Sequence, residues 1–454
     1  MQFEISKEFV DEIRDSVAEG RDSHLQSELS GLHPADIAEL FDSLKAAEAS
    51  YIFKLLPSDI AAEVMIELNE VDREKLLATL TSREIAEQVI DFIDSDDAAD
   101  VLSELPEEKK SEVLALISDE EQKSDIFDLL RYEEDSAGGM MATELVKVRG
   151  SWTIARGIRE MRKQAEEVDQ VYTIYVVDED DRLVGVLPLK KLLFSSSSIK
   201  TRISEIFDDA PMHYVHPDTT GEQCAKMMEK YDLVALPVVD TDMRLLGRIT
   251  IDDVVDFIKE EAEKDYQLAS GISESVEASD NVWLLSRARL PWLLIGLFGG
   301  MIVSKVIGTF EAQLEEVAIL VIFMPLIAAM AGNVGVQSSA IVVQGLANKS
   351  LSSSSVFNRL LKEFSVALLN GTICGVTIFA YSVIFERNLA LSYTVGISLL
   401  TVIIIAALFG TLVPLTLEKL RIDPALATGP FITTSNDIIG LTVYFTFAKY
   451  FFGI

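Results

Sequence analysis

Residues 317–348 read VAILVIFMPLIAAMAGNVGVQSSAIVVQGLAN and contain no charged side chain. About 20 consecutive apolar residues are enough for a helix to cross the hydrocarbon core of a bilayer, so this stretch predicts a membrane-spanning helix. Residues 364–385 and 388–417 are also uncharged, whereas residues 291–310 and 424–448 are apolar runs with one charge each, Lys305 and Asp437. The sequence therefore predicts five membrane spans, in preference to large buried core helices.

Charge is distributed unevenly along the 454 residues. The chain has 73 acidic and 39 basic residues, a net charge of −34, and yet a positive mean hydropathy of +0.26. Residues 291–454 contain 8 acidic and 8 basic side chains, so the whole acidic excess lies in residues 1–290. This soluble region suits cations and argues against nucleic acid as a partner, because a phosphate backbone requires Lys and Arg. Two cysteines, Cys224 and Cys374, are too few for a disulfide framework.

The N-terminal stretch MQFEISKEFVDEIRD is acidic and has no apolar signal region. It predicts that no signal peptide is cleaved and that the N-terminus is cytoplasmic, which places the C-terminus outside after five spans. Flanking charges support this orientation, because basic residues favour the cytoplasmic side. Seven lie at predicted inner ends (Arg287, Arg289, Lys349, Arg359, Lys362, Lys419 and Arg421) and three at outer ends (Lys305, Arg387 and Lys449).

A short helical phrase recurs between residues 32 and 130: HPADIAELF from His33, PSDIAAEVM from Pro57, SREIAEQVI from Ser82 and SDDAADVL from Ser95. Each copy places an acidic residue before an apolar pair, and the next apolar residue follows one helical turn later. Such repeats are typical of stacked short helices. The sequence predicts an all-α superhelical domain that acts as a scaffold or docking surface.

A different unit occurs twice between residues 138 and 255. IYVVDEDDRLVGVLPLKKLL begins at Ile174 and ALPVVDTDMRLLGRITIDDVV begins at Ala235. Each copy predicts a strand ending in Asp, a polar turn and a second strand that leads into a helix. The pair resembles tandem CBS domains, which often bind adenine nucleotides. The resemblance implies that Thr250 and Asp253 contact a nucleotide such as ATP; the alternative is a CBS pair that serves only as a dimerising gate.

The whole layout resembles the MgtE family of magnesium channels. The phrases that carry the resemblance are RYEEDSAGGMM from Arg131, PLIAAMAGNVGVQ from Pro325, DPALATGP from Asp423 and TTSNDIIG from Thr433. Ala331 departs from the family, which usually has glycine there.

The resemblance implies a homodimer that is a multi-pass protein of the bacterial inner membrane. It also implies a multi-domain fold, with an all-α superhelical N-terminal domain, an α/β tandem CBS pair and an α-helical transmembrane domain of five helices. The expected parts are the N domain (1–132), CBS 1 (133–198), CBS 2 (199–257), an acidic connecting or plug helix with its linker (252–280) and the pore domain (281–454).

Asp437 is the only acidic residue deep inside any predicted span. A carboxylate in hydrocarbon is costly, and no span has a basic residue at mid-depth, so Asp437 is expected to face water or a cation. The surrounding hydroxyl and amide groups suit Mg²⁺ better than zinc or copper. The resemblance implies a pore lined by spans two and five of two subunits. The predicted pore-metal residues are Asp437, Asn333, Thr433, Thr434 and Asn436; for all but Asp437, simple helix packing is the alternative.

Acidic residues also cluster in the soluble region. Asp96 and Asp100 are four residues apart, so they share one helix face and are placed to hold one cation together. Residues 252–270 are predicted to form one helix whose acidic side chains repel one another. We hypothesise that cytosolic Mg²⁺ bridges the N domain to the CBS pair, and this helix to the membrane part, and so closes the pore.

By resemblance, the regulatory positions are Asp96, Asp100, Glu222, Asp232, Asp253, Asp256, Glu261, Asp265 and Asp423, and the predicted helix adds Asp252. A solvated surface charge is the alternative for each. Thr220 and Lys264 stand where the family can place acids or small groups.

The remaining motifs exclude other classes. GLANKS at residues 345–350 lacks the second glycine of a phosphate-binding loop, and the apolar part has neither HExxH nor paired aspartates, so the chain is not predicted to be an enzyme. An anion channel is disfavoured because the only deep charge is negative. We predict a protein that lets Mg²⁺ enter the cytoplasm down its electrochemical gradient. A broader transporter of Mn²⁺ or Co²⁺, and a membrane-anchored sensor of Mg²⁺ or nucleotide without transport, are the alternatives.

Overall fold

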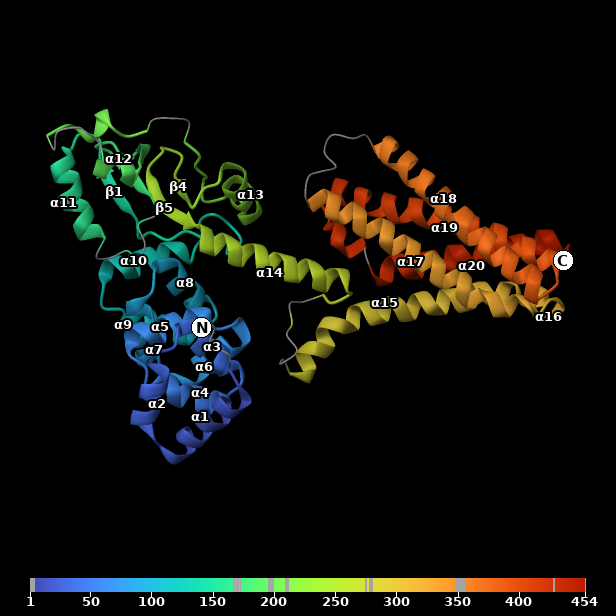
Figure 1. Ribbon diagram of the computed structural model, residues 1–454, viewed down its shortest axis with the longest axis horizontal. Coiled ribbons are helices and arrows are strands. Elements are labelled where there is room, and N and C mark those ends of the chain that lie inside the picture. The colour runs from blue at the N-terminus through green and yellow to red at the C-terminus, as the bar shows by residue number, and fades with distance from the viewer. Residues whose placement is uncertain are drawn as a thin grey trace. The chain divides into compact units, whose positions relative to one another are not determined.

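The computed structural model describes residues 5–165, 168, 171, 173–194, 200–208, 212–273, 276, 281–347, 356–427 and 429–453. The chain divides into two compact units, which we call unit 1 (Met1–Lys259) and unit 2 (Glu260–Ile454). Figure 1 colours unit 1 from blue to yellow-green and unit 2 from yellow to red. Lys349 and part of the predicted linker within 252–280 lie outside the described residues.

The first part of unit 1 is a series of short helices. Their bounds are α1 (Lys7–Glu19), α2 (Asp22–Leu29), α3 (Pro34–Asp42), α4 (Ala46–Phe53), α5 (Ser58–Glu67), α6 (Glu70–Thr79), α7 (Ser82–Gln88), a 3-10 turn (Ile90–Phe92), α8 (Ser95–Ser103), α9 (Glu107–Leu116) and α10 (Glu120–Leu129). Helices two apart in the chain pack on one another, α3 on α5, α5 on α7, α7 on α9 and α8 on α10. The predicted superhelical stack is confirmed.

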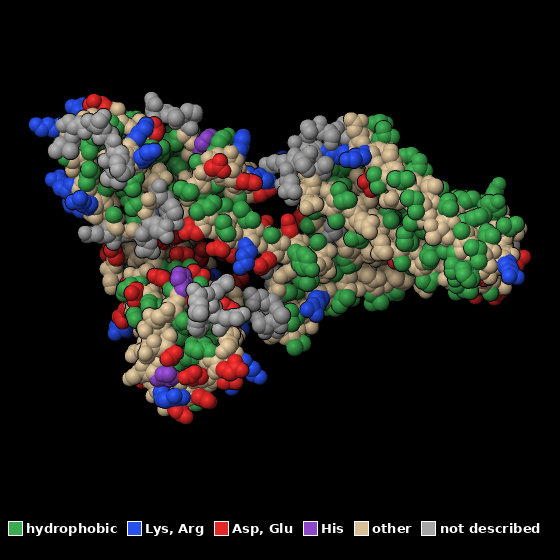
Figure 2. Space-filling view, in the orientation of Figure 1, with side chains coloured by type: hydrophobic (Ala, Val, Ile, Leu, Met, Phe, Trp, Pro, Cys, Tyr) green, Lys and Arg blue, Asp and Glu red, His purple; other side chains and the backbone are tan. Residues whose placement is uncertain are grey.

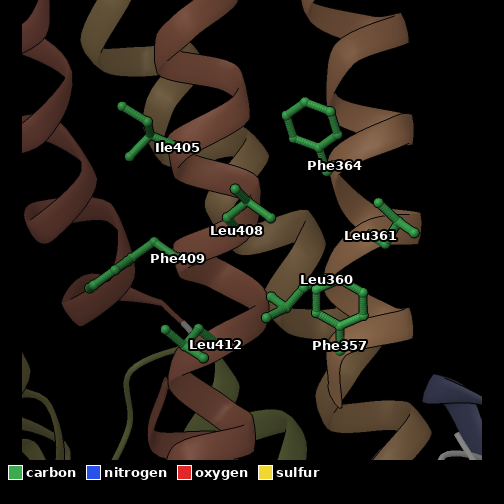
Figure 3. A pocket seen from close by; sticks show the side chains of 8 residues that line it. All are labelled: Phe357, Leu360, Leu361, Phe364, Ile405, Leu408, Phe409 and Leu412. Carbon is green, nitrogen blue, oxygen red and sulfur yellow. The ribbon is translucent and has the colours of Figure 1, made fainter. Parts of the chain in front are cut away.

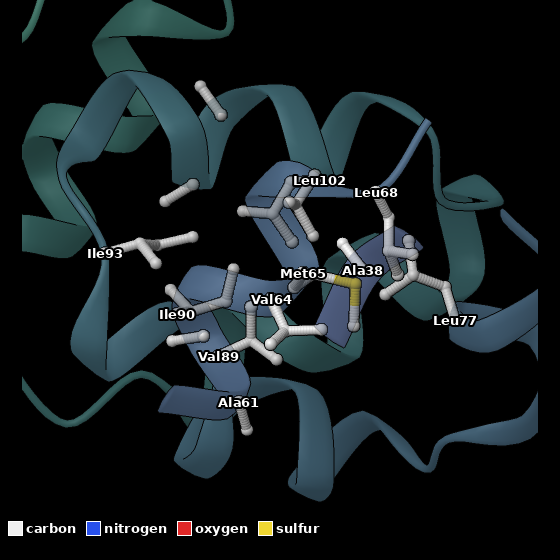
Figure 4. Packing of buried hydrophobic residues seen from close by; sticks show 14 of the residues in the cluster. Ala38, Ala61, Val64, Met65, Leu68, Leu77, Val89, Ile90, Ile93 and Leu102 are labelled. Carbon is white, nitrogen blue, oxygen red and sulfur yellow. The ribbon is translucent and has the colours of Figure 1, made fainter. Parts of the chain in front are cut away.

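The apolar pair of each repeated phrase builds the core of this stack. Ile85 and Ala86 in α7 are fully buried, and the pairs in α3 and α8 are at most 5% exposed. In α5, Ala61 is 1% exposed and Ile60 is partly buried against the same core. Figure 4 shows Ala38, Ala61, Val64 and other side chains from separate helices converging in one cluster. Each short helix therefore depends on its neighbours to cover its apolar face.

The second part of unit 1 contains two similar α/β copies. The first has the sheet β1-β2-β3, with β1 (Val146–Arg149) parallel to β2 (Ile174–Val177) and β2 antiparallel to β3 (Leu183–Leu187). The second has β4 (Ala235–Val239) antiparallel to β5 (Leu245–Thr250), and a parallel bridge between Val215 and Val238 takes the place of β1. The helices are α11 (Ile154–Gln164), α12 (Leu189–Phe194), a 3-10 turn (Ile203–Glu205), α13 (Gly221–Tyr231) and α14 (Ile251–Ala269).

The aspartate that ends the first strand of each hairpin fixes the turn. Asp178 Oδ1 accepts hydrogen bonds from the backbone N–H groups two and four residues ahead, both at 2.9 Å. Asp240 Oδ1 does the same at 2.8 Å. Asp side chains favour such turns because they bond to nearby backbone N–H groups. The repeat recognised in the sequence is thus the same hairpin made twice.

Unit 2 is helical throughout its described residues. Its elements are α15 (Val282–Thr309), α16 (Glu311–Glu316), α17 (Leu320–Ala347), α18 (Val356–Phe385), α19 (Leu389–Lys419), a 3-10 turn (Pro424–Ala427) and α20 (Pro430–Phe452). Helix α19 lies at the centre, where it packs against α17, α18 and α20, and it has more buried residues than any other described helix of unit 2.

Four helices among the described residues, α15, α17, α18 and α19, are long and apolar enough to span a membrane. The fifth expected span, α20, is a helix of 23 residues, but polar side chains between Thr433 and Asp437 lower its apolar character. The helical transmembrane class is confirmed by these elements, and the fifth span stays a prediction. Figure 2 shows acidic side chains spread over unit 1, whereas on unit 2 hydrophobic side chains cover the middle and charges gather towards the ends.

Candidate functional site

Asp437 lies on α20 beside the glycine-containing part of α17. A β-carbon added at Gly332 would be 3.8 Å from Asp437 Oδ1 and 3.4 Å from Thr433 Cγ2. Asp437 and Thr433 are four residues apart and so share one face of α20. Asp437 is half-buried, and no described basic side chain forms an ion pair with it. A carboxylate in a membrane helix without a protein cation is expected to meet water or a metal ion.

Small residues let α17 and α20 approach closely. A β-carbon at Gly440 would be 3.1 Å from the Ala331 Cβ, and one at Gly335 would overlap the Asn436 amide. Close contacts of this kind between membrane helices depend on residues without bulky side chains. Ala331, the departure from the family's glycine, is fully buried in this contact, so its methyl group fills the space opposite Gly440.

The structure brings only some of the predicted pore residues to the Asp437 face. Asn333 is exposed on α17 next to Gly332, and Gln337 is exposed one turn further on. Thr434 instead packs on Gly299 of α15, where a β-carbon would overlap its side chain. Asn436 is 1% exposed, and neither its Oδ1 nor its Nδ2 has a hydrogen-bond partner among the described residues. In a single chain, Asn436 lies against Gly335 of α17 and Thr434 against Gly299 of α15, so their roles in the pore stay predictions.

A second candidate site lies in unit 1, where three carboxylates converge. Single oxygens of Asp94, Asp96 and Glu144 lie within 4.8 Å of one another. Asp96 is 9% exposed and the other two are half-buried. Arg248 approaches from β5, with its Nη2 3.8 Å from Asp94 Oδ2. Three hard oxygen ligands in one place suit Mg²⁺ or Ca²⁺.

Backbone and hydroxyl contacts hold this cluster together. Asp94 precedes the first residue of α8, and Ser95 donates to Glu144 Oε2 through its N–H (3.2 Å) and its hydroxyl (2.9 Å). The Thr143 hydroxyl donates to Asp125 at 3.1 Å and lies 2.9 Å from the Ser95 hydroxyl. These bonds tie the start of α8 to the segment before β1, and so tie the N domain to the CBS pair.

Asp253 at the start of α14 lies near the same cluster. Its Oδ2 accepts from the N–H (2.9 Å) and the hydroxyl (2.5 Å) of Thr250. Burial raises its pKa. Burial, followed by the charges of Asp97 and Asp253, also raises the pKa of Asp96 well above its usual range. Carboxylates that raise one another's pKa repel when ionised, and a bound cation relieves that repulsion.

Asp100 is exposed but close enough to Asp97 for its charge to act on it, whereas the other predicted regulatory residues are not gathered into one described cluster. Glu222 pairs with Lys226 and Glu261 pairs with Lys264, the latter at 2.9 Å. Asp423 Oδ1 accepts from the Ala425 N–H at 2.8 Å and so caps a short turn. Exposed side chains are those of Asp100, Asp232, Asp252, Asp256 and Asp265.

Sequence reasoning missed Asp94, Asp97 and Glu144. Asp97 stands beside Asp96 in the repeated phrase, so the acidic run DSDD offered a local signal for it and for Asp94. Glu144 is about 50 positions away in the chain from its partners, and only the fold brings it to them.

Without divalent cations, unit 1 is expected to lose stability as the pH rises from 5 to 8. Burial, then the charges of Asp253 and Asp100, raises the pKa of Asp97 from 3.8 to about 8. The folded protein therefore holds a proton that the unfolded chain has released. A raised pKa contributes stability below the unfolded value, and that stability is lost as the pH rises through the folded value. Thermal melts of the full-length protein in EDTA at several pH values check this.

Added Mg²⁺ is expected to remove most of the loss of stability at high pH, because the cation replaces the protons between the carboxylates. Asp59→Asn, a change at an exposed acid in α5, should leave the pH dependence as it is. A melting temperature in EDTA that does not change with pH would contradict the expectation.

Family models match most of the chain. The MgtE model, described as a divalent cation transporter, matches residues 324–447, the MgtE intracellular N domain model matches residues 32–135, and the CBS domain model matches residues 137–198 and 203–260. Residues 277–361 also match the BT1 family. The order of the matches agrees with the order of the helical stack, the α/β copies and the membrane helices.

Three curated relatives that this chain resembles are named magnesium transporter MgtE. The protein from Enterococcus faecalis is 36% identical over 324 residues, which are 71% of each chain. The protein from Thermus thermophilus is 34% identical over 440 residues, which are 96% of this chain and 97% of the relative. A solved structure, the cytosolic domain of the Mg²⁺ channel MgtE in complex with ATP, is 36% identical, covers 55% of this chain and 99% of its own, and has a TM-score of 0.50. On these similarities in sequence and fold, the chain belongs to the MgtE family.

Proposed function

We propose that this protein conducts Mg²⁺ into the cytoplasm down its electrochemical gradient, through a pore at the α17–α20 face of a homodimer. The single observation that carries the proposal is Asp437, an acid on a predicted membrane helix beside Gly332, with no ion-pair partner among the described basic side chains. Oxygen ligands of this kind suit a hydrated Mg²⁺, which typically binds through one or two carboxylates and keeps several waters.

Exposed amide side chains on α17 support the proposed homodimer. Asn333 and Gln337 are exposed on α17 of a single chain, at a depth where polar groups in contact with lipid are costly. Polar membrane surfaces are tolerated where they are covered by protein or line a water-filled cavity. Two copies that face each other across Asp437 would enclose these amides in such a cavity.

The membrane potential supplies the driving force. Moving one charge across 100 mV is worth about 2.3 kcal/mol, so a divalent cation gains about 4.6 kcal/mol on entering a cell with a negative interior. Inward flow therefore needs no hydrolysis of a nucleotide.

We further propose that cytosolic Mg²⁺ closes the pore by binding the unit 1 cluster of Asp94, Asp96 and Glu144, with Asp97 and Asp253 beside it. Binding would hold the N domain against the CBS pair, because it removes the repulsion between their carboxylates. The start of α14 takes part through Asp253, and α14 continues into unit 2. Helix α14 would thus couple cation binding at the cluster to unit 2.

The CBS pair is proposed to bind an adenine nucleotide in addition. The related cytosolic domain was solved in complex with ATP, and Thr250 and Asp253 of this chain lie at the end of β5 and the start of α14. Their mutual hydrogen bonds would have to loosen for either side chain to reach a ribose or phosphate. Nucleotide and cation would then compete for the same carboxylate.

The proposal is tested by Mg²⁺ flux into liposomes that contain the purified full-length protein and a Mg²⁺-sensitive dye. We expect inward flux that increases with a negative interior potential and falls when Mg²⁺ on the cytosolic face is high. Competition with Mn²⁺ and Co²⁺ in the same assay separates a magnesium channel from a broader divalent-cation transporter. No Mg²⁺-dependent flux in an intact, correctly oriented sample would favour a membrane-anchored sensor instead.

A further inference from the structure

An apolar groove runs between α18 and α19 in unit 2. It has a volume of about 530 Å³, within the range of about 300–1,000 Å³ in which proteins hold small ligands. Figure 3 shows side chains of the two helices lining it. All eight are apolar: Phe357, Leu360, Leu361 and Phe364 from α18, and Ile405, Leu408, Phe409 and Leu412 from α19.

Residue size along the two helices explains why the groove exists. In their other halves, α18 and α19 pack closely: a β-carbon at Gly375 would be 2.9 Å from the Gly396 carbonyl oxygen, and the buried Ser392 hydroxyl donates to Ser382 Oγ at 3.0 Å. Towards the start of α18, phenylalanine and leucine replace these small residues and keep the helices apart. The resulting space is open, because Phe357, Leu361 and Leu412, which line it, are 72%, 55% and 46% exposed.

One basic residue, Lys419, stands at one end of the groove. Lys419 follows Leu412 by seven residues, which is two helical turns, so it lies on the same row of α19 as the lining side chains. Arg359 and Lys362 lie at the same end of α18 but on the face opposite its lining residues. Helix α18 has 30 residues and is about 45 Å long at 1.5 Å per residue, longer than a hydrocarbon core of about 30 Å. The basic end therefore reaches the level of lipid headgroups.

We propose that the groove binds a phospholipid with an anionic headgroup. One acyl chain lies between α18 and α19, and the phosphate pairs with Lys419. An apolar slot that continues into a basic end matches the two parts of such a lipid, since lysines near the membrane surface attract anionic headgroups. By the distribution of positive charges, this end faces the cytoplasmic leaflet, where anionic lipids are common.

A second copy of the chain fits the groove less well. In a two-fold dimer the same patch meets itself, which would bring Lys419 of one protomer towards the same residue of its partner. Like charges at a contact are unfavourable. The charge pattern therefore favours a lipid as the occupant.

A lipid bound in the groove would be connected to α17 through a hydrogen bond between α18 and α17. Glu363 of α18 accepts a hydrogen bond of 2.6 Å from the Ser338 hydroxyl of α17, and Ser338 is 4% exposed. Glu363 stands between the lining residues Leu361 and Phe364 in sequence. An acyl chain that steadies the start of α18 would also steady this bond to α17.

Native mass spectrometry of the full-length protein tests the site with phosphatidylglycerol and with phosphatidylcholine of the same acyl chains. The wild type should retain phosphatidylglycerol about fivefold better, the ratio expected for one favourable lysine–phosphate contact. Lys419→Glu should abolish that preference and leave phosphatidylcholine unchanged. Leu361→Trp, which fills the groove, should lower the retention of both lipids.

Two control variants match these changes outside the groove. Lys449→Glu reverses a charge near the end of α20, and Val376→Trp adds the same ring at a position that is 62% exposed on α18; both should bind lipid as the wild type does. Equal lipid retention in the wild type, Lys419→Glu and Leu361→Trp would overturn the proposal. So would a change from dimer to monomer in Leu361→Trp, which would identify a second copy as the occupant. Because the test measures binding and not flux, its failure would leave the proposed transport untouched.

Discussion

Replacing Asp437 with asparagine is expected to lower Mg²⁺ flux by on the order of 10- to 100-fold. The change keeps the shape of the side chain and removes its charge. A hydrogen bond or contact with a charged group is worth about 1.5–3 kcal/mol, which corresponds to roughly that range in an equilibrium or rate. Flux into liposomes measures the effect, with the amount and orientation of reconstituted protein held equal.

Three comparisons make the Asp437 result interpretable. Glu316→Gln removes an exposed acid next to α17 and should leave flux near the wild-type value. Asp437→Glu keeps the charge on a longer side chain and should retain flux but alter the preference among Mg²⁺, Mn²⁺ and Co²⁺, because Mg²⁺ demands the tightest geometry. Equal flux in the wild type and the asparagine variant would remove Asp437 from the ion pathway.

The double variant Asp96→Asn, Glu144→Gln is expected to make flux insensitive to Mg²⁺ on the cytosolic face over the range that closes the wild type. It removes two of the three carboxylates that converge in unit 1. Neutral amides bind Mg²⁺ far more weakly than carboxylates, and we expect the closing concentration to change by at least about tenfold, the effect of roughly 1.4 kcal/mol. Flux at several internal Mg²⁺ concentrations measures this shift.

Stability measurements separate a lost cation site from a damaged fold. Because the double variant also removes repulsion between buried carboxylates, unit 1 should melt higher than the wild type in EDTA, by roughly 2–4 °C for each kcal/mol relieved. Added Mg²⁺ should then raise its melting temperature much less than that of the wild type. Asp59→Asn serves as the matched control. A double variant that still responds to Mg²⁺ as the wild type does would rule out the cluster as the regulator.

Local patterns predicted the elements of this protein well. The phrase around Ile85 and Ala86 indicated a short helix with one buried pair, and the structure has that helix with both residues fully buried. The aspartate-ended strands at Asp178 and Asp240 indicated two equal hairpins, which the structure also has. These predictions succeeded because helix periodicity and aspartate turns depend on residues close together in the chain.

The sequence did not show which of the candidate pore residues share the face of Asp437. Thr433, Thr434, Asn436 and Asp437 are adjacent polar residues, and nothing in their order showed which of them would face Gly332. Helix geometry divides them: Thr433 and Asp437 share one face, whereas Asn436 turns to Gly335 and Thr434 to Gly299. Which face meets a neighbouring helix depends on packing between α15, α17 and α20, and the sequence of α20 alone does not contain that information.

The sequence by itself determined that an acidic soluble region precedes an apolar helical one, and that a lone aspartate stands in the last helix, because hydropathy and charge are properties of single residues and short windows. Only the tertiary structure decided that Glu144 joins Asp94 and Asp96, and that a groove opens between α18 and α19. Both features bring together residues about 50 positions apart. Contacts over that distance are set by how whole helices and strands pack, since the free energy that fixes them comes from burying surfaces of several elements at once.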